Sequence, residues 1–168
     1  PVPTERDARA QYLGMVSRHV TPVAVAAKRR GAVEMAQELR GMLVNSAQQF
    51  SFDVEMAFVD EGEARVVALQ ELLDKVQAED AVVTIDQLRA MVGVGRDDDA
   101  IRMGHERAIS FADVDWLVAV FVELAKTGRL HSIEQELVSR NLHVPDRYMV
   151  TIATEVAKVY PVGSGQRL

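Results

Sequence analysis

Residues 110–128 read SFADVDWLVAVFVELAKTG, a strongly apolar segment framed by a serine and a glycine. Its hydrophobic residues recur every three or four positions, which is the period of one face of an α-helix. Ser110, with Asp113 three residues later, matches the polar pattern that caps the start of a helix, and Gly128 matches the glycine that commonly follows the end of one. The segment therefore predicts a helix whose apolar face is formed by Val114, Leu117, Val118, Phe121, Val122 and Leu124.

The same capping signals recur along the rest of the chain. Thr21 followed by Pro22 is typical of a helix start, because proline is tolerated at the first helical position. The long apolar stripe that follows could be broken at Gly31. These signals predict an all-α protein with about seven or eight helices, formed by residues 1–161 as a single domain with a C-terminal tail at 162–168. The expected helix starts are Thr4, Thr21, Asp60, Thr84, Asp97, Ser110, Ser132 and Pro145.

Residues 50–58, FSFDVEMAF, carry two patterns at once. Every second residue is hydrophobic, which is the period of a half-buried strand. A helix over the same residues would be expected to leave Phe52 and Met56 exposed. We favour the helix, because a lone strand would have to pair with another chain, and we keep an isolated strand near residues 50–58 as the alternative. The residues that the helix would bury are Phe50, Val54, Ala57 and Phe58.

Composition excludes several classes of protein. The chain has 168 residues, of which 48% are hydrophobic, and it contains no cysteine. That apolar fraction is too high for an intrinsically disordered protein, and no apolar run reaches the roughly 18 residues of a membrane-spanning helix. The lack of cysteine excludes disulfide scaffolds and thiolate metal sites. Residues 1–6 lack the apolar run of a signal peptide, so we expect a cytoplasmic protein without a membrane span.

Charge is distributed unevenly along the chain. Residues 1–50 carry a net charge of +3, residues 51–100 carry −9, and residues 101–168 are balanced. A basic end and an acidic middle on one chain suit a complementary contact between copies of the same protein. The alternative is that both segments are solvated helix faces, with acidic residues placed at helix starts where the helix dipole favours them.

Two segments, residues 84–109 and 132–160, have the outline of a helix-turn-helix. In the first, residues 97–99 are three aspartates that would repel DNA at the start of the recognition helix. In the second, Arg147 and Lys158 are offset by neighbouring acidic residues. The overall acidity also argues against strong DNA binding, so we favour contact with nucleic acid less than contact between protein chains. The best basic cluster comprises Arg18, His19, Lys28, Arg29 and Arg30.

The sequence predicts no catalytic residue, no cofactor-binding residue and no metal ligand. Asp97–Asp99 lacks the spacing of a calcium loop and is better explained as helix capping. The histidines do not fall at metal-ligand spacing, although His131 and His143 could converge in space. Nucleophile and phosphate-binding motifs are missing. The histidines are His19, His105, His131 and His143.

Residues 124–128, LAKTG, together with residues 134–137, EQEL, resemble the helical TerB-like tellurite-resistance domains. The resemblance covers a short part of the chain. The acidic residues that this family would place around the turn are absent, so no functional residue is carried over.

These observations together favour a non-catalytic protein that works through assembly. We expect a self-assembling structural or interaction subunit, such as a coat, shell or tail component of a phage or virus, present as a homo-oligomer or as part of a larger particle. The alternative is a small DNA-associated regulator that uses the basic N-terminal third or the helix after Pro145. The preference for arginine over lysine is typical of GC-rich genomes, so a high-GC bacterium, phage or plasmid is the expected source.

Overall fold

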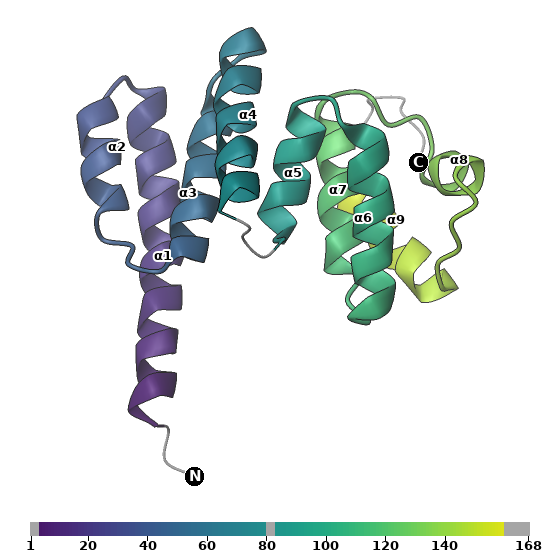
Figure 1. Ribbon diagram of the computed structural model, residues 1–168, viewed down its shortest axis with the longest axis horizontal. Helices are drawn as coiled ribbons and strands as arrows, with labels where there is room; N and C mark the ends of the chain where they lie inside the picture. Colours follow the sequence, from purple (N-terminus) through teal and green to yellow (C-terminus); the bar gives the residue numbers. More distant parts are fainter. Residues whose placement is uncertain (1–3, 80–82, 160–168) are drawn as a thin grey trace. The chain divides into compact units, whose positions relative to one another are not determined.

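The computed structural model describes residues 4–79 and 83–159, and these residues form nine α-helices and no strand (Figure 1). The predicted all-α class is confirmed, whereas the predicted number of seven or eight helices is too small. The predicted tail at 162–168 lies outside the described residues. Contacts divide the chain into two compact units, Pro1–Leu72 and Leu73–Leu168, and each is described by itself. The expectation of a single domain stays a prediction.

The first unit is built around helix α1 (Glu5–Arg29), which packs against α2 (Val33–Arg40) and α3 (Ser46–Val59). Helix α4 (Gly62–Ala78) follows, and the division between the units falls within it. The core of this unit is small and largely made of short side chains, which lets the three helices approach closely. Its buried members are Val20, Ala24, Ala27, Ala36, Leu43, Phe52 and Met56.

Helix α1 is continuous through Pro22, so the prediction of a new helix at Thr21 is wrong. A proline inside a helix removes one backbone hydrogen bond and costs about 3 kcal/mol relative to alanine. Val20, Ala24 and Ala27 are buried on one side of α1, both before and after the proline. Because most helical stability in proteins comes from packing of an apolar face, this burial offsets the local cost and keeps the helix intact.

Residues 50–58 lie within α3, so the alternative of an isolated strand is not supported. Asn45 caps this helix, because its side-chain oxygen accepts hydrogen bonds from the backbone N–H groups of Ala47 and Gln48. The expectation that the helix would leave Phe52 and Met56 exposed is also wrong. Those two side chains pack against α1 and α2, while residues on the opposite side of α3 are buried as well. The buried residues of α3 are Phe52, Val54, Met56 and Ala57.

A bidentate ion pair fastens α2 to α3. The guanidinium of Arg40 donates from Nε to one carboxylate oxygen of Asp53 at 2.7 Å and from Nη2 to the other at 2.9 Å. Hydrogen bonding to Asp53 raises the pKa of the Arg40 guanidinium above its ordinary value, and this effect outweighs the lowering caused by burial. Two parallel hydrogen bonds fix the orientation of both partners, so the pair sets the register of α2 on α3.

The second unit surrounds α7 (Asp115–Lys126) with other helices. Helices α5 (Ile85–Gly93), α6 (Asp97–Ser110) and α9 (Asp146–Ala157) all pack against α7, and the short α8 (Ile133–Ser139) lies between α7 and α9 in the chain. Burial on several sides explains why the sequence of α7 is so rich in large apolar residues. Its buried apolar residues are Leu117, Val120, Phe121, Leu124 and Ala125.

In the second unit, two predicted caps are confirmed by hydrogen bonds and one is wrong. Thr84 and Ser132 accept hydrogen bonds from the backbone N–H groups three residues later, at the starts of α5 and α8. Ser110, in contrast, is the last residue of α6, and α7 begins only at Asp115. Between them Ala112 adopts a left-handed conformation with φ of 50°, and the side chain of Asp113 accepts the N–H of Asp115.

Helices α6 and α7 approach each other closely at Gly104. A Cβ atom at this position would lie 3.2 Å from the backbone oxygen of Trp116 and 3.2 Å from Cγ2 of Val120. Both of those atoms belong to the buried side of α7, so they have little room to move. The contact therefore requires glycine or a very small residue on α6.

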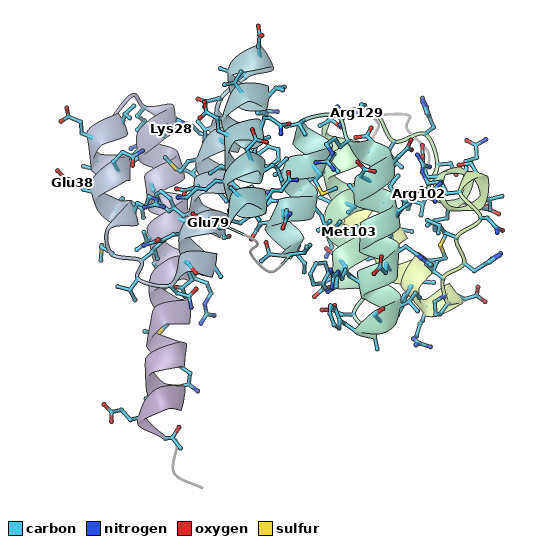
Figure 2. The ribbon with its side chains drawn as sticks, viewed as in Figure 1. Lys28, Glu38, Glu79, Arg102, Met103 and Arg129 are labelled. Carbon is cyan, nitrogen blue, oxygen red and sulfur yellow. The ribbon has the colours of Figure 1, made fainter. Side chains whose placement is uncertain are left out.

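Replacing Gly104 with valine should lower the free energy of unfolding by about 1–3 kcal/mol, because the added methyl groups force α6 away from α7. Urea denaturation followed by circular dichroism measures the change. Arg102→Val is the control, because it places the same β-branched residue on the exposed side of the same helix (Figure 2). Equal stability losses in the two variants would show that α6 does not need glycine at this contact.

Candidate functional site

The most deeply buried charge in the described residues belongs to Glu123 of α7, whose residue surface is 3% exposed. Arg89 of α5 donates from Nε to Oε1 of Glu123 at 2.9 Å and from Nη1 to Oδ1 of Asp86 at 3.0 Å. The Nζ of Lys126 lies 3.8 Å from the same Glu123 oxygen. One guanidinium therefore bridges two carboxylates and ties α5 to α7.

This network holds helices together and does not resemble a site for proton transfer. Arg89 meets two carboxylates and Lys126 adds a second positive charge, so Glu123 is enclosed by cationic partners from α5 and α7. Sequence reasoning missed this residue. The available signal was an acidic residue inside the apolar run of residues 117–125, where a charge is buried only if a partner from another helix reaches it.

Glu123→Gln should destabilise the protein by about 1–3 kcal/mol, because a neutral amide replaces the buried carboxylate that accepts from Arg89, which keeps only Asp86 as its charged partner among the contacts described above. Thermal and urea unfolding provide the measurement. Glu134→Gln on the exposed surface of α8 is the matched control and should change little. The double variant Arg89→Met with Glu123→Leu should recover most of the loss, since both charges are then removed together. If the double variant is no better than Glu123→Gln, the loss does not come from an unpaired charge.

The three aspartates at the start of α6 are each paired with a different arginine. Arg129, from the loop after α7 (Figure 2), donates to both carboxylate oxygens of Asp97 at 3.0 and 2.9 Å. The same guanidinium donates to the backbone oxygen of Val92, near the end of α5. Asp98 accepts hydrogen bonds from Arg140.

Asp99 accepts two hydrogen bonds from Arg96, the residue just before α6, at 3.1 and 3.0 Å. The aspartates thus occupy the first turn of α6, as the sequence predicted, where the helix dipole favours negative charge. The arginines from distant segments were not predicted. Because each carboxylate already has a cationic partner, the triplet is poorly suited to hold a cation, and the described residues contain no group of three or more potential metal ligands.

Arg140 is the most enclosed of these three arginines. It contacts Asp98 of α6 and both the side chain and backbone oxygen of Glu136 in α8. Burial by itself lowers the pKa of the Arg140 guanidinium, but its hydrogen bonds with Asp98 and Glu136 outweigh that effect and leave the pKa raised. The side chain therefore stays charged and joins α8 to the start of α6.

Arg140→Ala should lower the free energy of unfolding by about 1–3 kcal/mol, because it removes charge-assisted hydrogen bonds from a side chain that is only 15% exposed. Arg96→Ala provides a comparison in which the lost ion pair lies in solvent, with side chains 48% and 57% exposed, and it should cost less than about 1 kcal/mol. Urea unfolding of both variants measures the difference. A reversed order would mean that enclosure of Arg140 does not strengthen its pairing.

The histidines form no metal-binding group among the described residues. The Nε2 atom of His105 in α6 lies 2.8 Å from the backbone oxygen of His143, in the loop before α9. His19 and His131 are exposed, and His131 and His143 take part in no metal-ligand group among the described residues. The contact between His105 and His143 fastens the loop between α8 and α9 to α6.

Both predicted helix-turn-helix outlines do contain consecutive helices, α5 with α6 and α8 with α9. In the first pair, the aspartates at the start of α6 are paired with arginines, as described above. In the second, Asp146 lies in the first turn of α9, and Lys158 pairs with Glu155 at 2.8 Å. Nucleic-acid binding by either pair stays a prediction.

The basic cluster of the first unit has two parts. Lys28 points inward, where its Nζ donates to the backbone oxygen of Met56 at 2.7 Å and lies 3.2 Å from Oδ1 of Asp60 (Figure 2). Arg65 of α4 donates in the same region to the backbone oxygens of Asp60 and Phe58. These two cations thus satisfy carbonyl groups at the C-terminal end of α3, where the helix has no backbone donors left.

The remaining members of the cluster lie on the surface of α1 and just after it. They are Arg18, His19, Arg29 and Arg30, and all four residues are exposed. Beside them is a surface hollow of about 620 Å³, lined by residues that include Lys28, Arg29, Val33, Phe58, Asp60 and Arg65. Two of its cations are occupied by the end of α3, and Asp60 and Glu61 add negative charge to the lining, so the hollow is not a uniformly basic site.

No family model, curated protein or solved structure matches the chain. The short resemblance to tellurite-resistance domains therefore gains no support from these comparisons. None of the helices in the described part of the chain is long and apolar enough to cross a membrane.

Proposed function

We propose that the protein is a self-assembling structural or interaction subunit without catalytic activity of its own. The observation that carries the proposal is the distribution of exposed large hydrophobic side chains. Among the described residues, eight of these lie in the first unit, against four in the second. An excess of exposed apolar side chains in one part of a chain favours a contact with another protein chain there. The eight residues are Met15, Val23, Val33, Met35, Met42, Val44, Val66 and Val67.

The shape of the first unit supports the same proposal. Helix α1 continues well beyond the ends of α2 and α3 (Figure 1). Met15, in the N-terminal half of α1, is 50% exposed. Isolated helices are marginally stable in water, so packing against another chain would stabilise this part of α1. A second copy of the chain would cover this helix and bury its apolar residues.

The charged groups of the second unit add support. Arg89, Arg129 and Arg140 bind carboxylates from other helices, so these charges serve to hold the unit together. The proposal has two narrower forms. One is that the protein is a coat, shell or tail component of a phage or virus, and the other is that it assembles in the cytoplasm. The alternative of a DNA-associated regulator stays a prediction.

Size-exclusion chromatography with light scattering should give a mass above that of one chain, and the mass should rise with protein concentration. Met15→Ser with Val23→Ser should shift this association to at least tenfold higher concentration, because two exposed apolar contacts are lost. Val138→Ser with Val150→Ser, in the second unit, is the matched control and should leave it unchanged. A strict monomer at the highest concentration reached would overturn the proposal.

A further inference from the structure

Helix α1 presents a continuous stripe of exposed residues on the side opposite its buried face. The buried face is formed by Val20, Ala24 and Ala27, and the exposed residues recur at intervals of three or four, as positions on one side of a helix do. Between Ala8 and Val33 the sequence has no acidic residue. This stripe, the α1 outer face, comprises Ala8, Gln11, Met15, Arg18, Pro22, Ala26 and Arg29, with His19, Val23 and Arg30 along its edge.

Helix α4 carries a second stripe of the same spacing and opposite charge. Its buried face is formed by Leu69, Leu73 and Val76. The opposite side is exposed throughout and contains acidic residues interrupted by small or branched apolar ones, with Lys75 as its one cation. This stripe, the α4 outer face, comprises Ala64, Val67, Glu71, Asp74 and Ala78, with Glu63 beside it.

We propose that the α1 outer face of one copy packs along the α4 outer face of a second copy. This inference rests on the proposed function and specifies its contact. Both stripes repeat at an average of 3.5 residues, which is the spacing that lets two helices pack side by side over several turns. Arg29 and Arg30 would then face acidic groups such as Glu63 and Glu71, while Met15, Val23 and Val67 lose their contact with water.

The second copy suits the α1 outer face better than a nucleic acid does. The chain carries a net charge of −6, which opposes approach to a polyanion. Met15, Val23 and Ala26 lie among the arginines and gain nothing from contact with phosphates, whereas they match the apolar residues of α4. Lys28, the remaining cation of this region, is already engaged with Asp60 and the end of α3.

Each copy has one α1 outer face and one α4 outer face to offer. The contact can therefore close as a two-fold dimer in which both pairs form, or continue as a ring or filament in which each copy contacts two neighbours. Because the charges on both faces are exposed, the contact should weaken as salt rises and the Debye length falls below about 10 Å. Growth beyond two copies is what a coat, shell or tail particle requires.

Charge reversal on each face tests the contact. The first variant combines Arg29→Glu with Arg30→Glu, and the second combines Glu63→Lys with Glu71→Lys. Each variant alone should associate at least tenfold more weakly than the natural protein, as measured by light scattering or sedimentation. An equimolar mixture of the two should regain association, because the reversed α1 face of the first variant matches the reversed α4 face of the second.

Recovery in the mixture also shows that both variants are folded. The matched control is Glu34→Lys with Glu38→Lys, which makes the same change of charge on exposed residues of α2 (Figure 2) and should leave association unaltered. If the natural protein associates but neither variant associates more weakly, this contact is overturned and the proposed function still stands. The same holds if the mixture fails to recover association. A natural protein that stays monomeric would overturn both.

A labelled DNA duplex at low salt completes the test. We expect no retention of the duplex by the natural protein in a gel-shift assay. Retention that is lost in Arg29→Glu with Arg30→Glu, together with unchanged self-association in that variant, would assign the α1 outer face to nucleic acid and overturn the proposal.

Discussion

A buried carboxylate determines how the helices of the second unit can pack. Glu123 lies in α7, the helix against which α5, α6 and α9 all pack, and its charge is removed from water when they do so. An unpaired charge in such a place costs several kcal/mol, so only an arrangement that brings Arg89 to Glu123 is stable. The ion pair adds little net energy compared with two well-packed apolar residues, but it restricts the position of α5 on α7. We infer that it selects one packing among those that the apolar residues alone would allow.

Arginine repeats this role at other places in the chain. Arg129 and Arg140 join segments 32 and 42 residues apart, and each also donates to a backbone carbonyl near the end of a helix. In the first unit, Lys28 pairs with Asp60 and donates to the carbonyl of Met56, and Arg65 donates to the carbonyl of Phe58, both near the end of α3. A side chain that meets both a carboxylate and a carbonyl near a helix end satisfies two requirements of a small helical protein at once.

The sequence predicted which segments are helical better than it predicted where one helix ends and the next begins. The caps at Thr84 and Ser132 depend on neighbouring residues, so local pattern was sufficient to find them. The continuity of α1 through Pro22 depends on packing against other helices, which no local pattern records. Residues 50–58 were ambiguous for a related reason. Phe52 and Val54 lie on nearly opposite sides of α3 and are both buried, so a helix covered on two sides imitates the alternation of a strand.

The candidate sites were less predictable still. The acidic triplet at 97–99 was placed correctly at a helix start, but its partners come from separate parts of the chain that are close only after folding. Glu123 has no motif around it, and its partner Arg89 lies 34 residues away. Long-range ion pairs of this kind follow from topology, and a single sequence with no matching family supplies no such information.

The position of the division between the two units has a consequence for how this protein can change over evolutionary time. Leu72 and Leu73 belong to different units but are neighbours in α4. Domain boundaries that fall in flexible linkers allow a gene segment to be exchanged without disturbing what it leaves behind. Here an exchange at the boundary would replace half of a helix, and the buried residues Leu69 and Leu73 would come from different parents. The two units are therefore expected to be inherited together and to diverge as one gene.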